Sequence, residues 1–111
     1  MVVTETRRVS DGGVVRLPKI IASKVGEGVV YWVEVRGDIY ACARRPTVGS
    51  ILFVSRMYKD GSRTRIPVHA RRRLNITDGD TLIFVCEGED VYCCRVEIIR
   101  RSDVASKPII V

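Results

Sequence analysis

The pattern of apolar and polar positions predicts a chain built mostly from short strands. Alternating apolar and polar residues over four to eight positions indicate a strand, whereas apolar residues four apart indicate a helix. The expected strands are residues 2–9, 14–17, 29–35, 39–43, 51–58, 63–66, 81–86 and 91–99. Two short helices are expected after Pro18 and Pro67, because proline ends a strand and suits a helix start. Apolar residues four apart should turn these helices toward the core: Ile21 with Val25, and Ala70 with Leu74.

The same order of features occurs twice along the chain. "RLP" at 16–18 recurs as "RIP" at 65–67, and "GDIYAC" at 37–42 recurs as "EDVYCC" at 89–94. The offset grows from 49 to 52 positions, which places three extra residues in the "NITDGD" loop of the second copy. We therefore expect two strand-strand-helix-strand-strand copies. They are residues 2–43 and 51–99, with a linker at 44–50 and a tail at 100–111.

Length decides how the two copies relate. A copy of roughly 45 residues is too small to bury a sufficient core alone. The two copies should therefore share one core, so that all 111 residues form a single domain.

Positive charge is concentrated in one segment. The chain has a net charge of +6. Residues 56–73 hold seven positive side chains and one acid, so the net charge of this segment alone is also +6. Such a field suits a polyanionic partner. The alternative is an ordinary solvated surface whose ion pairs contribute little. Acids to form such pairs are scarce in this segment, which favours the polyanion.

Several functional classes find no support. No apolar run approaches the roughly eighteen residues of a membrane span, and the N-terminus lacks a signal peptide, so we expect an intracellular protein without a membrane partner. A single histidine, His69, and four cysteines without CxxC spacing argue against a metal site. Without a glycine-rich phosphate loop or a nucleophile-base pair, we expect neither an enzyme nor a cofactor. His69 is expected at the surface of the basic helix.

Buried free thiols are the expected state of the cysteines in an intracellular chain. Disulfides remain the alternative for a protein from a hyperthermophile. Cys42 and Cys94 occupy equivalent positions of the repeat, which favours a packing role. Trp32 lies in the apolar strand "VVYWVEV" and is expected in the core, although an exposed patch with Tyr31 would offer a surface for dimerisation.

The second copy resembles a known family. Its stretch "DGSRTRIPVHARRRLNITDGDTLIFV" has a turn, a strand ending in apolar-Pro, an arginine-rich short helix and a "GD" loop before a hairpin. This order resembles the AbrB/MazE/SpoVT family of swapped-hairpin DNA-binding domains, clearly over 51–99 and more weakly over 2–43. The resemblance implies a mainly β, double-ψ or swapped-hairpin barrel made by two intertwined β-β-α-β-β copies, as a single-chain pseudodimer. It also implies an archaeal or prokaryotic transcriptional regulator that binds double-stranded DNA in the cytoplasm, associated with the nucleoid.

The resemblance also implies contact residues. Matched to the family pattern, DNA contacts fall on Arg56, Arg63, Arg71 and Arg72, where guanidinium groups would contact phosphates and groove edges. Strand alternation adds Arg65 beside Arg63, and Arg73 flanks Arg72 on the helix. The equivalent first-copy positions are Arg7, Val14, Ala22 and Ser23, with Arg16 and Lys19 nearby. The full expected set is Arg56, Arg63, Arg65, Arg71, Arg72, Arg73, Arg7, Arg16 and Lys19.

Three alternatives stay open. A MazE-like antitoxin would use the same fold to hold a toxin with its C-terminal tail, and the tail at 100–111 is short for that purpose. A single-stranded nucleic-acid barrel would need exposed aromatic residues along the basic segment, where the sequence offers Tyr58. A homodimer of pseudodimers would bring two arginine-rich copies together and restore a symmetric reading face.

Overall fold

The computed structural model describes residues 2–101. The first copy contains β1 (Val2–Arg8), a 3-10 turn η1 (Asp11–Gly13), β2 (Val14–Arg16), α1 (Lys19–Val25), β3 (Val29–Val35) and β4 (Asp38–Cys42). The second contains β5 (Ser50–Arg56), β6 (Arg63–Arg65), α2 (Val68–Leu74), β7 (Thr81–Glu87) and β8 (Cys93–Ile99). The predicted mainly β chain with two short helices is confirmed, and so is the repeated order of elements. Pro18 and Pro67 directly precede the helices. None of the described helices has the length and apolarity that a bilayer crossing requires.

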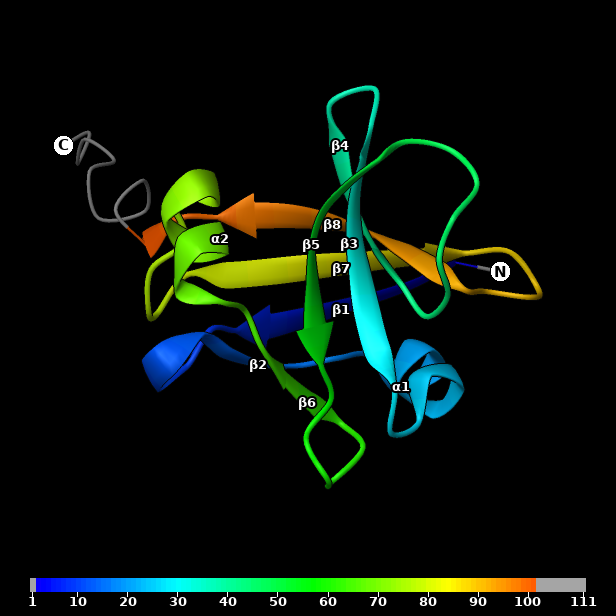
Figure 1. Ribbon diagram of the computed structural model, residues 1–111, viewed down its shortest axis with the longest axis horizontal. Helices are drawn as coiled ribbons and strands as arrows, with labels where there is room; N and C mark the ends of the chain where they lie inside the picture. The colour runs from blue at the N-terminus through cyan, green and yellow to red at the C-terminus, as the bar shows by residue number, and fades with distance from the viewer. Residues whose placement is uncertain (1, 102–111) are drawn as a thin grey trace, which may run out of the picture.

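The strands form one large sheet and one small ribbon (Figure 1). The sheet is antiparallel, with six strands in the order β1-β7-β8-β4-β3-β5, while β2 and β6 pair separately. Within residues 2–101 these strands do not form a closed barrel, so the mainly β class is confirmed while the swapped-hairpin barrel stays an expectation.

The two copies interleave throughout the fold. β1 of the first copy pairs with β7 of the second, and β5 of the second pairs with β3 of the first. The central β4–β8 pairing and the β2–β6 ribbon also join different copies. Two backbone hydrogen bonds repeat this relationship 49 residues apart, from Leu17 N to Ser62 O at 2.8 Å and from Ile66 N to Gly13 O at 2.9 Å. Each copy thus depends on the other for its hydrogen-bonded partners, and equivalent strands make equivalent pairings.

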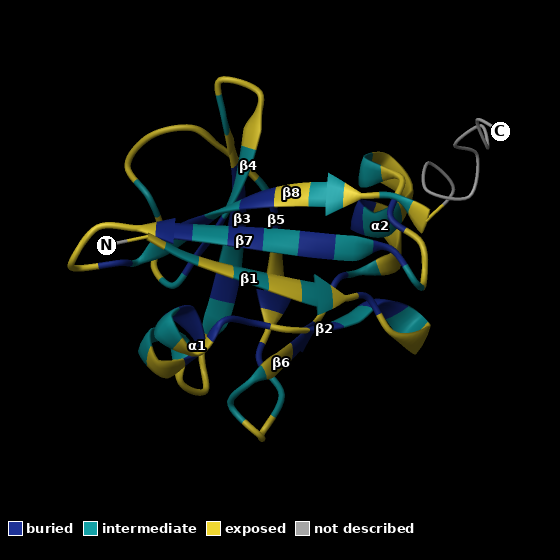
Figure 2. Cartoon of the chain, turned by 180° about the vertical axis from the view of Figure 1, so that it is seen from behind, coloured by how far each residue is buried: buried dark blue, intermediate teal, exposed yellow. Residues whose placement is uncertain are grey.

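Twist brings the two halves of the sheet face to face. In Figure 1, β1, β7 and β8 run horizontally across the view, while β3, β4 and β5 run roughly vertically. Trp32 stacks on Phe53, with ring centroids 5.3 Å apart, and lies 6.4 Å from Phe84 of the other half. Figure 2 shows buried residues as recurring dark-blue bands along β7. The prediction that Trp32 packs in the core is confirmed, since it is 1% exposed, and an exposed patch around it is wrong.

The helices complete this shared core from its periphery. α1 contributes the buried side chains of Ile21 and Ala22, and α2 contributes Ala70. Val25 and Leu74, the other two predicted core-facing residues, are half-buried against the core. Burial of these apolar faces is the main reason why two seven-residue helices form at all, because isolated helices of that length are marginal in water.

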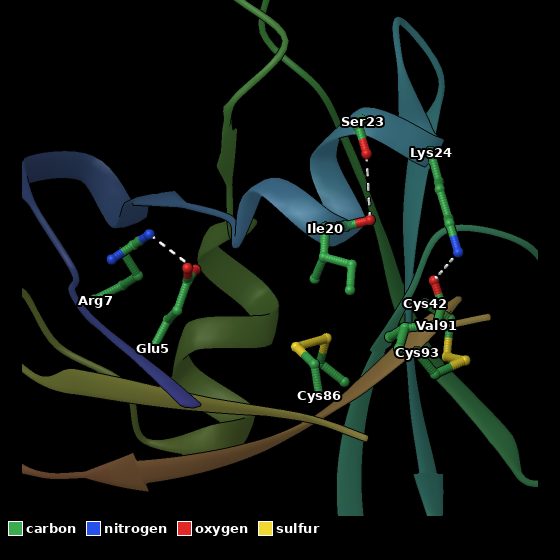
Figure 3. Close-up of a disulfide and its surroundings, with 10 residues drawn as sticks. Glu5, Arg7, Ile20, Ser23, Lys24, Cys42, Cys86, Val91 and Cys93 are labelled. Carbon is green, nitrogen blue, oxygen red and sulfur yellow. Dashed lines mark hydrogen bonds and ion pairs between the residues drawn. A yellow bond between two sulfur atoms is a disulfide. The ribbon is translucent and has the colours of Figure 1, made fainter. Parts of the chain in front are cut away.

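All four cysteines are paired, so the expectation of free thiols is wrong. Cys42 bonds to Cys93, and Cys86 bonds to Cys94 (Figure 3). The cause is the strand register: β4 places Cys42 directly opposite Cys93, and β7 places Cys86 beside Cys94. The Cα atoms are 4.1 and 4.4 Å apart, close enough for a disulfide.

Candidate nucleic-acid interface

The β2–β6 ribbon carries arginines on its outer face. Its alternate residues Val15 and Thr64 are buried, while Arg16, Arg63 and Arg65 are exposed. In register, Arg16 lies opposite Arg63, and Val14 lies opposite Arg65. The predicted sharing of one face by Arg63 and Arg65 is confirmed, and Arg16 of the other copy joins them.

Asp60 orders the turn that precedes β6. Its carboxylate accepts hydrogen bonds from the backbone N–H groups of Ser62 and Arg63, at 2.9 and 3.1 Å, and from Nε of Arg63 at 2.5 Å. The bond from the Ser62 backbone and then the Arg63 guanidinium hold the pKa of Asp60 well below its usual value. Arg63 also lies 5.4 Å from the ring of Tyr58. Arg63 is therefore the ribbon arginine whose charge is balanced by a neighbour.

Helix α2 presents three consecutive arginines. Ala70 faces the core, which leaves Arg72 and Arg73 exposed and Arg71 half-buried beside the helix. Nε of Arg71 donates a hydrogen bond to the carbonyl oxygen of Ile66, at 3.0 Å. This bond turns Arg71 back toward the end of β6 and fixes the position of its guanidinium.

The turn η1 of the first copy, which we name the glycine turn (Asp11–Gly13), lies against these side chains. A Cβ atom added at Gly13 would come within 2.5 Å of Nε of Arg71 and 2.9 Å of the Ile66 carbonyl oxygen. At Gly12 the nearest atom would be Nη2 of Arg65, at 3.5 Å. The sequence indicated only a turn here. Its two adjacent glycines were the available sign that other groups pack closely against this backbone.

The positive surface continues from the ribbon to α1. Arg7, Arg16 and Lys19 line a groove of about 380 Å³ together with the hydroxyl-bearing residues Ser23 and Ser62. Nη1 of Arg16 donates to Oγ of Ser62 at 3.0 Å. Of the expected first-copy contacts, the structure thus brings Arg7, Arg16 and Lys19 to one groove.

The register corrects one predicted equivalence. Arg8 pairs with Thr81 in β7, and Arg56 pairs with Val29 in β3, two partners that are themselves equivalent in the repeat. Arg8, not Arg7, therefore corresponds to Arg56. The shift arises because the turn before β6 is one residue longer than the turn before β2.

Arg7 has different surroundings from Arg56. Its side chain is 29% exposed and forms an ion pair with Glu5 on the same strand, at 2.9 Å (Figure 3). Arg56 is exposed at the end of β5, and its backbone carbonyl oxygen accepts a hydrogen bond from the Thr64 hydroxyl at 2.9 Å. Arg56 therefore lies beside the ribbon, whereas Arg7 lines the groove beside α1.

Two arginines outside the expected contact set lie near the ribbon. Arg8 and Arg101 line a groove of about 610 Å³ with Arg63, and Asp11 and Asp78 line it too. This groove is of mixed charge, so it adds less to the positive field than the ribbon does. His69 is exposed on α2, as expected.

We name the outward-facing cations of the ribbon and of α2 the arginine surface: Arg16, Arg63, Arg65, Arg71, Arg72 and Arg73. Among residues 2–101, Arg63 is the member of this set that has a carboxylate partner. Guanidinium groups without a carboxylate partner are suited to binding phosphates or carboxylates through paired N–H donors. No group of three metal-ligating side chains occurs in the described chain. Comparisons with protein-family models, curated proteins and solved structures find no match.

Proposed function

We propose that this chain binds double-stranded DNA as an AbrB-like transcriptional regulator, associated with the nucleoid, in which one chain supplies both halves of a swapped-hairpin pseudodimer. The observation that carries the proposal is the arginine surface. Five of its six guanidinium groups have no carboxylate partner among the described residues. So many unpaired cations on one surface repel one another, and a polyanion relieves that repulsion.

The shape of the surface favours a duplex. A two-stranded β-ribbon fits the major groove of B-DNA, which is about 12 Å wide. The β2–β6 ribbon is three residue pairs long, or roughly 10 Å at the usual rise of a strand. α1 and α2 follow its two strands directly and so lie at its opposite ends (Figure 1). Ribbon arginines would then reach base edges, while Arg72, Arg73 and Lys19 would contact phosphates.

A single-stranded nucleic acid suits this surface less well. Proteins that bind single strands stack successive bases on exposed aromatic rings. In residues 2–101 every Phe, Tyr and Trp side chain is buried or half-buried. Tyr58, the aromatic residue of the basic segment, already lies beside Arg63. The interface therefore offers charge without a stacking platform.

The interleaved pairings support the family relationship. Each copy gives its first strand to the other copy's hairpin, and the two second strands pair with each other. The swapped-hairpin resemblance implies such an exchange of strands. In this chain the six exchanged and paired strands form an open sheet. The antitoxin alternative depends on the tail at residues 100–111, which from residue 102 lies outside the described residues.

The test is binding of a labelled duplex of about 30 base pairs, followed by fluorescence anisotropy over a series of salt concentrations. We expect Arg71→Ala with Arg72→Ala to weaken binding by about 1–3 kcal/mol for each lost contact. We also expect the slope of log K against log salt to fall by about 0.9 for each phosphate contact removed.

The matched control removes the same charge elsewhere. Arg44→Ala with Arg45→Ala deletes two adjacent exposed arginines of the linker, outside the arginine surface. This variant should keep nearly all of the affinity. Equal losses in the two double variants would show that net charge, and not this surface, determines binding.

A further inference from the structure

Equivalent positions in the turns of the two copies hold different residues. The glycine turn leaves room for Arg71 at Gly13. In the repeat, whose copies are 49 positions apart here, Gly13 is equivalent to Ser62 and Ala22 is equivalent to Arg71. At the second turn, residues 59–62, which we name the serine turn, Ser62 carries a side chain whose hydroxyl binds Arg16. Ala22 is buried, with 5% of its surface exposed. One side of the pseudodimer thus combines glycine with arginine, and the other combines serine with alanine.

The difference extends along the helices. Ser23 of α1 stands where α2 has Arg72. Lys24 of α1 stands where α2 has Arg73, but its Nζ donates to the carbonyl oxygen of Val91 at 2.5 Å and pairs with Asp90 at 3.3 Å. α2 therefore presents three arginines without carboxylate partners in the described chain, whereas α1 presents Lys19.

The ribbon is also asymmetric, at one of its two pairs of equivalent positions. Arg16 and Arg65 are equivalent and identical. Val14, however, occupies the position equivalent to Arg63. An arginine at a groove edge favours guanine, while an apolar side chain favours the methyl group of thymine. The end of the ribbon next to α1 presents Arg16 opposite Arg63, and the end next to α2 presents Val14 opposite Arg65, so the two ends offer different chemistry to the bases beneath them.

We infer that one chain binds its duplex in a single orientation, on a site without two-fold symmetry. The α2 half, with Arg65, Arg72, Arg73 and the Arg71 held at the glycine turn, makes most of the phosphate contacts. The α1 half completes the fold and contributes Arg16 and Arg63 of the ribbon but fewer phosphate contacts. This inference rests on the proposed function and adds the symmetry of the target to it.

Selection of bound sequences from a random duplex pool tests the inference, together with a hydroxyl-radical footprint of the selected site. The stoichiometry is set at one chain per footprint by titration above the dissociation constant. We expect a motif that is not an inverted repeat, and stronger backbone protection on one side of its centre. Arg71→Ala with Arg72→Ala should remove protection on that strong side and leave the other side unchanged.

A second pair of variants tests the glycine turn itself. Gly13 has a φ of +80°, and Gly61 of the serine turn has a φ of +70°, but a Cβ at Gly61 would meet no atom within 4 Å. Both alanine variants therefore carry a similar backbone strain, and Gly13→Ala alone displaces Arg71. We expect Gly13→Ala to lose protection on the strong side and Gly61→Ala to keep it. In a background of Arg71→Ala, Gly13→Ala should cause a smaller loss than in the wild-type chain, because only the contact with the Ile66 carbonyl oxygen remains.

The converse variant makes the two halves alike. Val14→Arg, Ala22→Arg and Ser23→Arg give the first copy the residues of the second, and Ser62→Gly gives the second copy the glycine of the first. Selection with this protein should return an inverted repeat with equal protection of its two halves.

The outcomes separate the two proposals. A symmetric motif with equal protection of both halves by the wild-type chain would overturn the inference while leaving DNA binding intact. Failure of the wild-type chain to bind any duplex at low salt would overturn the proposed function itself.

Discussion

Cys42 in β4 of the first copy is bonded to Cys93 in β8 of the second copy, across the centre of the six-stranded sheet. The other disulfide, Cys86–Cys94, lies within the second copy. The copies are therefore joined covalently at two places, by the linker at residues 44–50 and by the Cys42–Cys93 bond. This bond also closes the longer loop, with partners 51 positions apart against 8.

This pairing predicts what happens when the linker is cut. With a specific protease site inserted at 44–50, the cleaved chain should migrate as one species without reductant and as two fragments with it. Cys42→Ser should release the fragments without reductant, whereas Cys86→Ser should not. The measurement is denaturing gel electrophoresis of the cleaved proteins. Two fragments from the unreduced wild-type chain would show that the copies are not joined in this way.

Trp32 and Ser55 form a buried hydrogen bond, with the indole N–H donating to Oγ at 2.8 Å. Ser55→Ala leaves that donor buried without a partner, which typically costs about 1–3 kcal/mol. We expect a corresponding fall in the free energy of unfolding in urea, monitored by the fluorescence of Trp32, the single tryptophan. Ser50→Ala, at an exposed position of the same strand, should change stability little. If both variants unfold at the same urea concentration, the bond contributes nothing to stability.

The loop before β7 is held by the carboxylate of Asp80, which accepts hydrogen bonds from the backbone N–H groups of Thr77 and Arg101, at 2.8 and 2.7 Å. Burial raises the pKa of Asp80, but the bonds from Arg101 and Thr77 outweigh it, so that the pKa lies below its usual value of 3.8. The unfolded chain therefore binds this proton more readily than the folded chain, and stability falls as the carboxyl is protonated.

Asp80→Asn tests this carboxylate. At pH 7 the variant should lose about 1–3 kcal/mol of unfolding free energy, because it exchanges a charged acceptor for a neutral amide. The difference from wild type should persist down to about pH 4 and shrink as the pH falls through the folded-state pKa. Urea unfolding at a series of pH values measures it, with Asp78→Asn as an exposed control in the same loop. A difference that stays constant to pH 2 would exclude a role for the charge.

Helix α2 ends at Asn75 in a left-handed conformation, with φ +55° and ψ +47°. The equivalent residue of α1 is Gly26, which also has a positive φ. Asn75→Gly should therefore retain wild-type stability, whereas Asn75→Ala should lose about 1 kcal/mol, because Ala has a Cβ but lacks the short polar side chain that lets Asn adopt this conformation. His69→Ala, exposed on the same helix, is the control in thermal unfolding. Equal melting temperatures for the glycine and alanine variants would contradict the assignment of strain to this residue.

Local pattern was sufficient to predict the elements. The strands follow from alternation, and the two helices follow from apolar residues four apart after Pro18 and Pro67. The shared outer face of Arg63 and Arg65 also follows from alternation, because it depends only on positions two apart in one strand. Internal similarity likewise predicted the repeated order, including the three extra residues before β7.

Contacts between the copies could not be read in the same way. A difference of one residue in turn length decides whether Arg7 or Arg8 matches Arg56, and a one-residue shift moves a strand's side chains to its other face. The disulfides depend on register across β4, β8 and β7. Arg71 was expected to be a contact residue from the sequence, but its position against Gly13 depends on a turn far away in the sequence.

The sequence by itself determined the type and order of the elements, the two copies and the segment that holds the excess charge. Each of these depends on residues near one another along the chain. Only the tertiary structure decided which strands pair, which cysteines meet and which guanidinium groups are held together. Those choices depend on hydrogen bonding and packing between copies about 50 residues apart, where a change of one residue in a connecting turn alters every partner.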